Sequence, residues 1–132
     1  MSATNFDILI PFVEHLGIEL IEKADGKMRL RFTPRPEHLN SWNGIHGGVL
    51  MTLLDVALGS AARSLDPACV GATTVELKSN FLGTARDGGV VCEATLVHGG
   101  KTTQVWDAVV ANEQTGKTMA LFRCTQMILY GK

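Results

Sequence analysis

Clusters of basic residues are missing from this 132-residue chain, whose formal net charge is only −1. Binding to nucleic acid needs grouped Lys and Arg side chains against the phosphates, so we expect no nucleic acid partner. No apolar stretch approaches the about 20 residues that a helix needs to cross a bilayer. The N-terminus has no basic leader ahead of its apolar residues, which argues against a secretory signal. Together these absences predict a cytoplasmic protein without a membrane partner.

Cysteine is scarce, and the three residues present are Cys69, Cys92 and Cys124. Their number is odd and their spacing matches no metal site, so we expect free thiols in a reducing compartment. His38 and His98 also lack ligand spacing, and we expect them on loops or strand ends with no metal role.

Hydrophobic residues make up 45% of the chain, which suits one buried core in a single domain over residues 1–132. From Gly47 to about Arg63 apolar residues occur on every side of a helix, which indicates a helix buried in the middle of the protein. A shorter helix or turn is expected over 5–16. Alternation and turn signals predict strands over 17–22, 27–32, 73–82, 88–98, 102–112 and 117–129. Short turns favour an antiparallel meander, and the expected class is α+β.

Asp55 is the only charged side chain between Gly47 and Ala62. It lies mid-helix and so cannot cap the helix, and burying an unpaired carboxylate is costly. Such a group is paired, hydrogen-bonded or functional. Position alone does not separate a structural Asp from a catalytic one.

The sequence His46-Gly47-Gly48 stands where this helix begins. Two glycines let a ligand approach the backbone, and the first helical turn offers unpaired N–H groups at the positive end of the dipole. A thioester carbonyl that becomes an oxyanion would be stabilised there. A plain loop-to-helix junction is the alternative explanation.

The separation of these two features predicts a dimer. Gly47 and Asp55 are eight residues apart, or about 12 Å along a helix axis. An attacked carbonyl carbon must lie within about 3 Å of both the oxyanion donor and the attacking water. One chain does not readily meet this condition, whereas two antiparallel helices related by a two-fold axis place the start of one beside the middle of the other. We therefore expect a homodimer at minimum.

The region around the helix start resembles the signature of hotdog-fold thioesterases of the phenylacetate-pathway (PaaI-like) type. It reads Asn40-Ser41-Trp42-Asn43-Gly44-Ile45-His46-Gly47-Gly48-Val49, followed by Leu54-Asp55 and Gly59. The resemblance covers nearly the whole chain, including Asn80-Phe81-Leu82 and Gly100-Lys101-Thr102. It implies a hotdog fold, in which a long central helix is wrapped by an antiparallel β-sheet, and dimers that commonly pair into a homotetramer. It also implies an acyl-CoA thioesterase that uses no cofactor, with coenzyme A bound as part of the substrate.

The resemblance also assigns roles to the motif. Asp55 would activate the hydrolytic water or attack the thioester directly, and the backbone N–H of Gly47 would polarise the thioester carbonyl. Asn40 would orient the water or the carbonyl. His46 would hold the loop and the dimer contact. Many members carry Gly-Thr where this chain has Asn43-Gly44, so Asn43 competes with Asn40 for the orienting role.

Further residues follow from the same resemblance. A hydroxyl would assist the water from the subunit that supplies the carboxylate, and Thr74 matches it, with Thr73 as the alternative. Residues 81–86 and 98–103 match the regions that bind the CoA nucleotide and pantetheine. The expected substrate contacts are Gly48, Asn43, Phe81, Leu82, Gly83, Arg86, His98, Gly100, Lys101 and Thr102, with Arg86 and Lys101 on the phosphates. Gly83-Thr84 stands where many members have a proline, which loosens that loop.

Two other functions fit the sequence: a hotdog dehydratase acting on acyl-carrier thioesters, and a non-catalytic acyl-CoA-binding protein. His-Gly-Gly at the helix start with Asp55 nine positions after His46 favours hydrolysis over dehydration. A pure binder gains nothing from a carboxylate facing the thioester. Trp42, Phe81 and Trp106 are candidates for an acyl pocket, with simple packing as the alternative.

Overall fold

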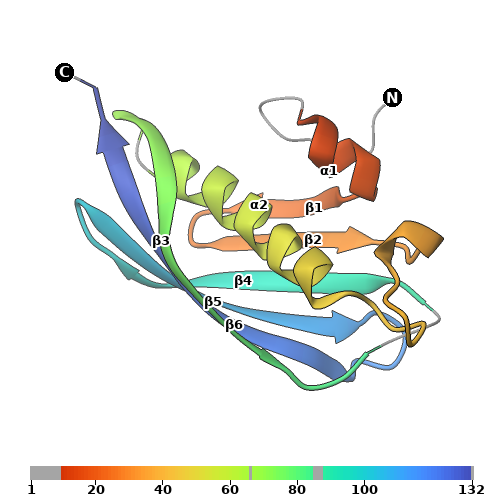
Figure 1. The fold of residues 1–132 in the computed structure, drawn as a ribbon. Helices are drawn as coiled ribbons and strands as arrows, with labels where there is room; N and C mark the ends of the chain where they lie inside the picture. Colours follow the sequence, from red (N-terminus) through yellow and green to blue (C-terminus); the bar gives the residue numbers. More distant parts are fainter. Residues whose placement is uncertain (1–9, 66, 85–87, 132) are drawn as a thin grey trace.

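The computed structural model describes residues 10–65, 67–84 and 88–131, with the backbone alone for 59–65 (Figure 1). The elements follow in the order α1 (Pro11–Leu16), β1 (Glu19–Ala24), β2 (Lys27–Phe32), the 3-10 turn η1 (Pro36–His38), α2 (Gly47–Leu65), β3 (Cys69–Phe81), β4 (Val90–Gly99), β5 (Thr103–Asn112) and β6 (Thr118–Tyr130). The predicted long helix and the predicted strands are present, with bounds shifted by up to four residues. The described part of the predicted N-terminal helix is α1, which ends where Gly17 takes a left-handed conformation (φ 68°).

All strands join one antiparallel sheet in the order β1-β2-β4-β5-β6-β3. The sheet curls around α2, which lies across its concave face (Figure 1). This is the α+β hotdog arrangement that the motif implied. The expected meander holds only from β4 to β6, because β3 pairs with β6 at the sheet edge instead of with β4.

One side of α2 forms the centre of the core. Its buried residues include Leu50, Leu53, Leu54 and Leu58, which pack against the inward side chains of the strands. In β6 those inward positions include Phe122, and the alternation of buried and exposed residues along β4, β5 and β6 follows the two-residue period of a strand. The core thus accounts for the apolar helix and for the strand pattern together.

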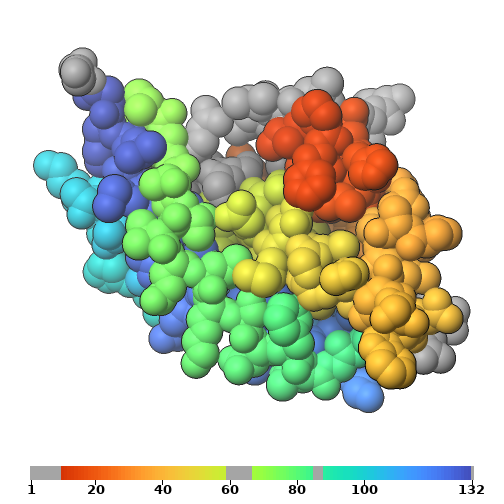
Figure 2. All heavy atoms as spheres, viewed as in Figure 1, coloured from red at the N-terminus to blue at the C-terminus, as the bar shows by residue number. Residues whose placement is uncertain are grey.

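The opposite side of α2 is uncovered in the single chain, and Figure 2 shows it between α1 and β3. Asp55 lies on this side and is exposed. The expectation that the helix is covered all round and that Asp55 is buried is therefore wrong for one chain. The sheet encloses α2 from one side only. Among the described residues, no helix combines the length and the apolar character that a membrane span requires.

Candidate active site

Asp55 is joined to two strands by a chain of side-chain hydrogen bonds. The Thr74 hydroxyl on β3 donates to Asp55 Oδ1 at 2.6 Å. The Gln126 amide on β6 in turn donates from Nε2 to Thr74 Oγ1 at 2.7 Å. Thr74 and Gln126 are direct partners in the β3–β6 ladder, so the sheet register aligns them beneath the helix. Within the part of the chain that the structure describes, Thr74 thus gives the carboxylate a side-chain hydrogen bond at Oδ1 and none is found at Oδ2.

The register also separates the two threonine candidates. Thr73 pairs with Met127 and is exposed, whereas Thr74 pairs with the buried Gln126. Successive strand residues point to opposite faces of a sheet, so only one of the two hydroxyls can face α2. The structure brings Thr74, the first choice from sequence, to Asp55, and its role in hydrolysis stays a prediction.

Asn40 organises the loop that leads into α2. Its Oδ1 accepts hydrogen bonds from the backbone N–H of Trp42 at 2.9 Å and of Gly44 at 3.1 Å. Its own N–H donates to the Gly44 carbonyl at 2.8 Å. Asn43 takes a left-handed conformation in this turn (φ 61°), which Asn adopts more readily than most residues. Asn40 Oδ1 is thus occupied by the loop itself.

The helix start is built by backbone contacts. The His46 N–H donates to the His38 carbonyl at 2.8 Å, and the His46 carbonyl accepts from Val49 N–H at 3.0 Å. A Cβ added to Gly47 would lie 3.0 Å from the Phe81 ring, whereas one added to Gly48 would meet nothing within 4 Å. Gly47 is thus needed for packing inside the chain, and the open approach is at Gly48.

His38 is fully buried, and its backbone carbonyl is the acceptor that holds the end of this loop at His46. Its Nδ1 accepts from the Arg35 N–H at 2.9 Å, and its Nε2 lies 2.8 Å from the Leu16 carbonyl. A ring that accepts at Nδ1 and donates at Nε2 is a neutral imidazole. Its role is to tie η1 to the end of α1. The described residues contain no group of three or more His, Cys, Asp or Glu side chains arranged to hold a metal ion.

The segment after β3 lies against the loop before α2. The N–H groups of Leu82 and Gly83 both donate to the Met119 carbonyl, at 2.8 and 3.0 Å. Thr84 Oγ1 accepts from the Ile45 N–H at 2.8 Å. Thr84 thus supports the Asn40–His46 loop, a contact that sequence reasoning missed. Arg86 lies outside the described residues.

The second expected CoA-binding segment lies toward the other end of the sheet. Gly100 N–H donates to the Thr103 carbonyl, the Lys101 carbonyl accepts from the Tyr130 hydroxyl at 2.6 Å, and the Thr102 carbonyl accepts from Ile128 N–H. Exposed His98 precedes this turn.

The ladder partners show how far apart the two segments are. Thr103 pairs with Met127, and Phe81 pairs with Ala120. Seven residues along β6 separate those partners, or about 23 Å at about 3.3 Å per residue. One chain does not bring the two segments together.

Of the three aromatic pocket candidates, Trp42 is 82% exposed, Phe81 is half exposed and Trp106 is fully buried. Trp106 is a core residue whose Nε1 donates to Gln104 Oε1 at 2.9 Å. Phe81 packs edge-on against Phe122 and touches the position of Gly47, so it lies beside the helix start. Of the two exposed rings, Phe81 therefore lies at the His46-Gly47-Gly48 end of α2, and Trp42 is in the loop that leads into it.

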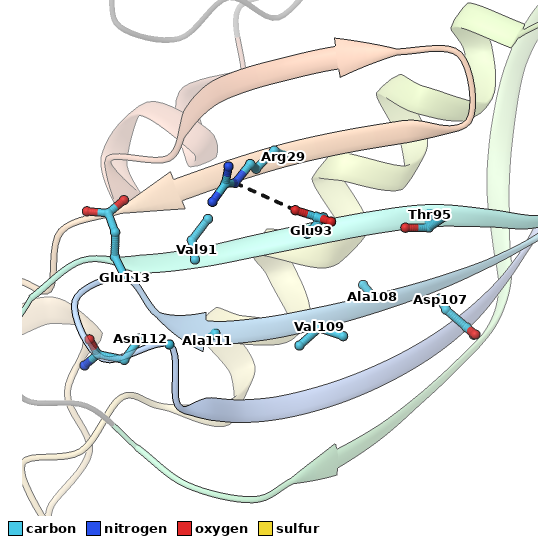
Figure 3. A pocket seen from close by; sticks show the side chains of 11 residues that line it. Arg29, Val91, Glu93, Thr95, Asp107, Ala108, Val109, Ala111, Asn112 and Glu113 are labelled. Atoms are coloured by element: carbon cyan, nitrogen blue, oxygen red, sulfur yellow. Dashed lines mark ion pairs between the residues drawn. The ribbon is translucent and has the colours of Figure 1, made fainter.

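One hollow of the described surface lies away from all of these residues. It holds about 390 Å³ and lies on the face of the sheet opposite α2. Figure 3 shows its walls from β2, β4 and β5, with Arg29 Nε 3.9 Å from Glu93 Oε2. Its lining residues are Arg29, Val91, Glu93, Thr95, Asp107, Ala108, Val109, Ala111, Asn112, Glu113 and Gly116. None of them was a predicted site residue, and the candidate site is on the α2 side.

A long helix wrapped by a six-stranded antiparallel sheet, with a carboxylate at mid-helix and His-Gly-Gly at its start, defines a hotdog-fold thioester hydrolase. The family model described as the Thioesterase superfamily matches residues 43–119, and the chain belongs to this family. The predicted resemblance to PaaI-like thioesterases and the predicted class of enzyme, a thioester hydrolase, are confirmed.

Individual relatives agree with this membership. The chain is 31% identical over 113 residues to the 1,4-dihydroxy-2-naphthoyl-CoA hydrolase of Listeria monocytogenes, covering 85% of this chain and 90% of the relative. It is 36% identical over 110 residues to the acyl-coenzyme A thioesterase PaaI of Escherichia coli, covering 82% and 75%. The solved structure of that E. coli protein superposes with a TM-score of 0.82 at 30% identity, over 92% of this chain and 86% of the other.

Proposed function

We propose that the protein hydrolyses acyl-CoA thioesters at two equivalent sites formed between two copies of the chain. The observation that carries this proposal is the division of the site residues over the fold. Gly47 lies beside Phe81 near one end of the sheet, whereas Asp55 is bonded to Thr74, further along the same helix and strand. Each chain therefore offers an oxyanion half and a carboxylate half that are too far apart to serve one carbonyl.

The proposed dimer joins the halves through the free edge of β3. Within the described residues this 13-residue strand pairs only with β6, and it exposes Val70 and Val75. An unpaired edge with apolar side chains favours pairing with another strand. Two copies that pair antiparallel along β3, related by a two-fold axis perpendicular to the sheet, also place both α2 helices on one side of the joined sheet, with their uncovered sides toward one another.

In the proposed reaction, Asp55 Oδ2 accepts a proton from a water whose oxygen attacks the thioester carbon. The N–H of Gly47 from the other subunit stabilises the oxyanion, with Asn40 and His46 holding the loop around it. The C–S bond then breaks, the acid is released, and the proton returns to the departing CoA thiolate. Direct attack by the carboxylate, followed by hydrolysis of the anhydride, is the alternative route through the same residue.

Coenzyme A would lie across the interface. Phe81, Leu82 and Gly83 are at the helix-start end of one subunit, and a two-fold axis brings the turn from His98 to Thr102 of the other subunit toward them. Lys101 is exposed on that turn and is a candidate phosphate contact. Gly48 and Asn43 line the open side of the helix start.

We further propose a homotetramer in the cytoplasm. The sheet face opposite α2 exposes Val109 and its ladder partner Leu121, an apolar pair suited to a contact with a second dimer. The buried Cys92 and Cys124 are free thiols, which suits a reducing compartment.

Mixed subunits test the shared site. Asp55→Ala and Asn40→Ala each damage a different half, so co-refolded mixtures contain heterodimers with one intact site. We expect each variant alone to be inactive and the equimolar mixture to regain about a quarter of the unsubstituted turnover of aryl- and fatty-acyl-CoA panels. A mixture as inactive as its components would refute a site shared between subunits. A control mixture of Asp55→Ala with Asp55→Asn must stay inactive.

A further inference from the structure

A buried amide lies behind the carboxylate and its hydroxyl. Gln126 is 1% exposed on the inner face of β6, a face otherwise occupied by residues such as Phe122 and Ile128. Its Nε2 lies 2.7 Å from Thr74 Oγ1 and 3.2 Å from Cys124 Sγ. Its Oε1 is buried without a hydrogen-bond partner among the described residues. A half-satisfied amide in a core is unfavourable, so its presence calls for an explanation.

The chemistry of the three groups gives the chain of hydrogen bonds a single direction. An ionised carboxylate only accepts, so the Thr74 hydroxyl must donate its one proton to Asp55 Oδ1. The Thr74 oxygen is then left as an acceptor, and it faces an amide. Only the NH₂ end of that amide can satisfy it, which leaves the Gln126 carbonyl end unpartnered.

We infer that Gln126 is a positioning residue for hydrolysis: it holds the Thr74 hydroxyl as a donor to Asp55 Oδ1 and so keeps Oδ2 aimed at the reacting water. Without Gln126 the Thr74 hydroxyl rotates freely between Asp55 and other acceptors. The carboxylate then loses its fixed orientation, and the water loses its aligned base. This inference rests on the proposed role of Asp55.

A second buried glutamine provides the comparison within the same sheet. Gln104 lies directly across from Gln126 in the β5–β6 ladder and is 3% exposed. Its Oε1 accepts from Trp106 Nε1. It is therefore matched to Gln126 in burial and location, but its hydrogen bond with Trp106 leads into the core and not toward Asp55.

Cys124 does not offer an alternative chemistry here. Burial raises the pKa of its thiol, so it stays neutral and is a poor nucleophile. Sulfur is a weak acceptor, so its contact with Gln126 Nε2 at 3.2 Å is the weaker of the two bonds that this amide makes. The strong partner of the amide is Thr74.

The first experiment compares Gln126→Leu with Gln104→Leu on one acyl-CoA substrate. We expect kcat to fall about five- to tenfold in Gln126→Leu with KM within about twofold, as befits the loss of one hydrogen bond that matters in the transition state. Gln104→Leu should lower the melting temperature while keeping kcat. Equal kcat losses in both would overturn the inference, because they would indicate general damage to the core. Gln126→Met is the second variant if Gln126→Leu does not fold.

A double-mutant cycle shows whether Gln126 acts through Thr74. The kcat of Thr74→Val combined with Gln126→Leu should equal that of Thr74→Val alone, since the relay is already broken. In a Thr74→Ser background, where the hydroxyl remains, Gln126→Leu should again lower kcat. Independent losses that multiply in the Thr74→Val background would contradict a role through Thr74.

Asp55→Ala distinguishes the failure of this inference from the failure of the proposed function. Unchanged turnover in Asp55→Ala would remove both. A collapse of turnover in Asp55→Ala with full kcat in Gln126→Leu would leave the proposed function standing and remove only the role of Gln126.

Discussion

The two halves of the site are built in different ways. The loop from Asn40 to His46 is held mainly by hydrogen bonds within the loop, from its backbone and the Asn40 side chain, with Thr84 and the His38 carbonyl as partners from outside it. The region around Asp55 is held by side chains from α2, β3 and β6, which are distant in sequence. The first, local half is built from consecutive residues and is recognisable in the sequence as a motif. The second, distributed half combines residues that are far apart in the sequence and is found only when the sheet register is known.

The largest expected effect comes from the distributed half. Asp55→Asn keeps the size of the side chain and a possible contact with Thr74 but removes the base. We expect kcat for acyl-CoA hydrolysis to fall by about 10²- to 10⁴-fold, as for loss of a general base or nucleophile. Circular dichroism and the dimer mass should be unchanged. Retention of more than a tenth of the turnover would break the assignment of Asp55.

Much of this architecture was predictable. Continuous apolar periodicity located α2, and alternation located the strands, because both reflect burial on one side of each element. The position of β3 next to β6 was not predictable, since it depends on packing between segments that no local pattern encodes. The exposure of Asp55 was also missed, because the helix is covered from one side only in a single chain.

The site divides in the same way. Motif residues such as Asn40, Gly47 and Asp55 were found from sequence, and their roles remain predictions. Gln126 was missed, although its polar side chain interrupts the inward series that includes Cys124 and Ile128 on β6. An inward polar residue in an otherwise apolar series was the signal available. Its partner Thr74 is 52 positions away, so the contact itself was out of reach.

In the loop from Asn40 to His46, a substitution should act by leaving backbone N–H groups without a hydrogen-bond acceptor. Asn40→Ala removes the acceptor of two N–H groups, and that of Gly44 is at a buried position. Loss of a partner for a buried donor costs about 1–3 kcal/mol, so we expect a lower free energy of unfolding together with lost turnover. Denaturant unfolding measures the first effect. Exposed Ser41→Ala is the matched control in the same loop, and an equal loss there would show that the Asn40 bonds are unimportant.

Two adjacent glycines sharpen the contrast at the helix start. Gly47→Ala places a methyl 3.0 Å from the half-exposed Phe81 ring, which must shift at a cost of about 1 kcal/mol. Gly48→Ala meets nothing and should stabilise the helix by about 0.5–1 kcal/mol through its better propensity. Thermal unfolding of both variants checks the opposite signs. Combining Gly47→Ala with Phe81→Leu should recover the lost stability if the ring is the obstacle.

The smallest expected effect comes from the ion pairs of Arg31. Like the hydrogen bonds around Asp55, they join separate elements, but they are largely exposed. Arg31 donates to Glu113 from Nε at 2.8 Å and to Glu19 from Nη1 at 2.9 Å. Its guanidinium lowers the pKa of Glu113 through these hydrogen bonds. Because solvent screens such pairs, we expect Glu113→Gln to reduce the free energy of unfolding by less than about 1 kcal/mol at neutral pH.

The pH dependence of that difference follows from the direction of the pKa shift. A carboxyl whose pKa is lowered on folding stabilises the protein above its ordinary pKa of 4.5, and this contribution is lost as the pH falls through the lowered value. Urea unfolding of the unsubstituted protein and Glu113→Gln should therefore converge below that pH, and also at about 1 M salt. The hydrogen bond between Gln126 and Thr74 is between neutral groups and partly buried, so low pH and high salt should not weaken it as they weaken the exposed ion pair. A salt-sensitive kcat loss in Gln126→Leu would show instead that both networks are governed by surface electrostatics.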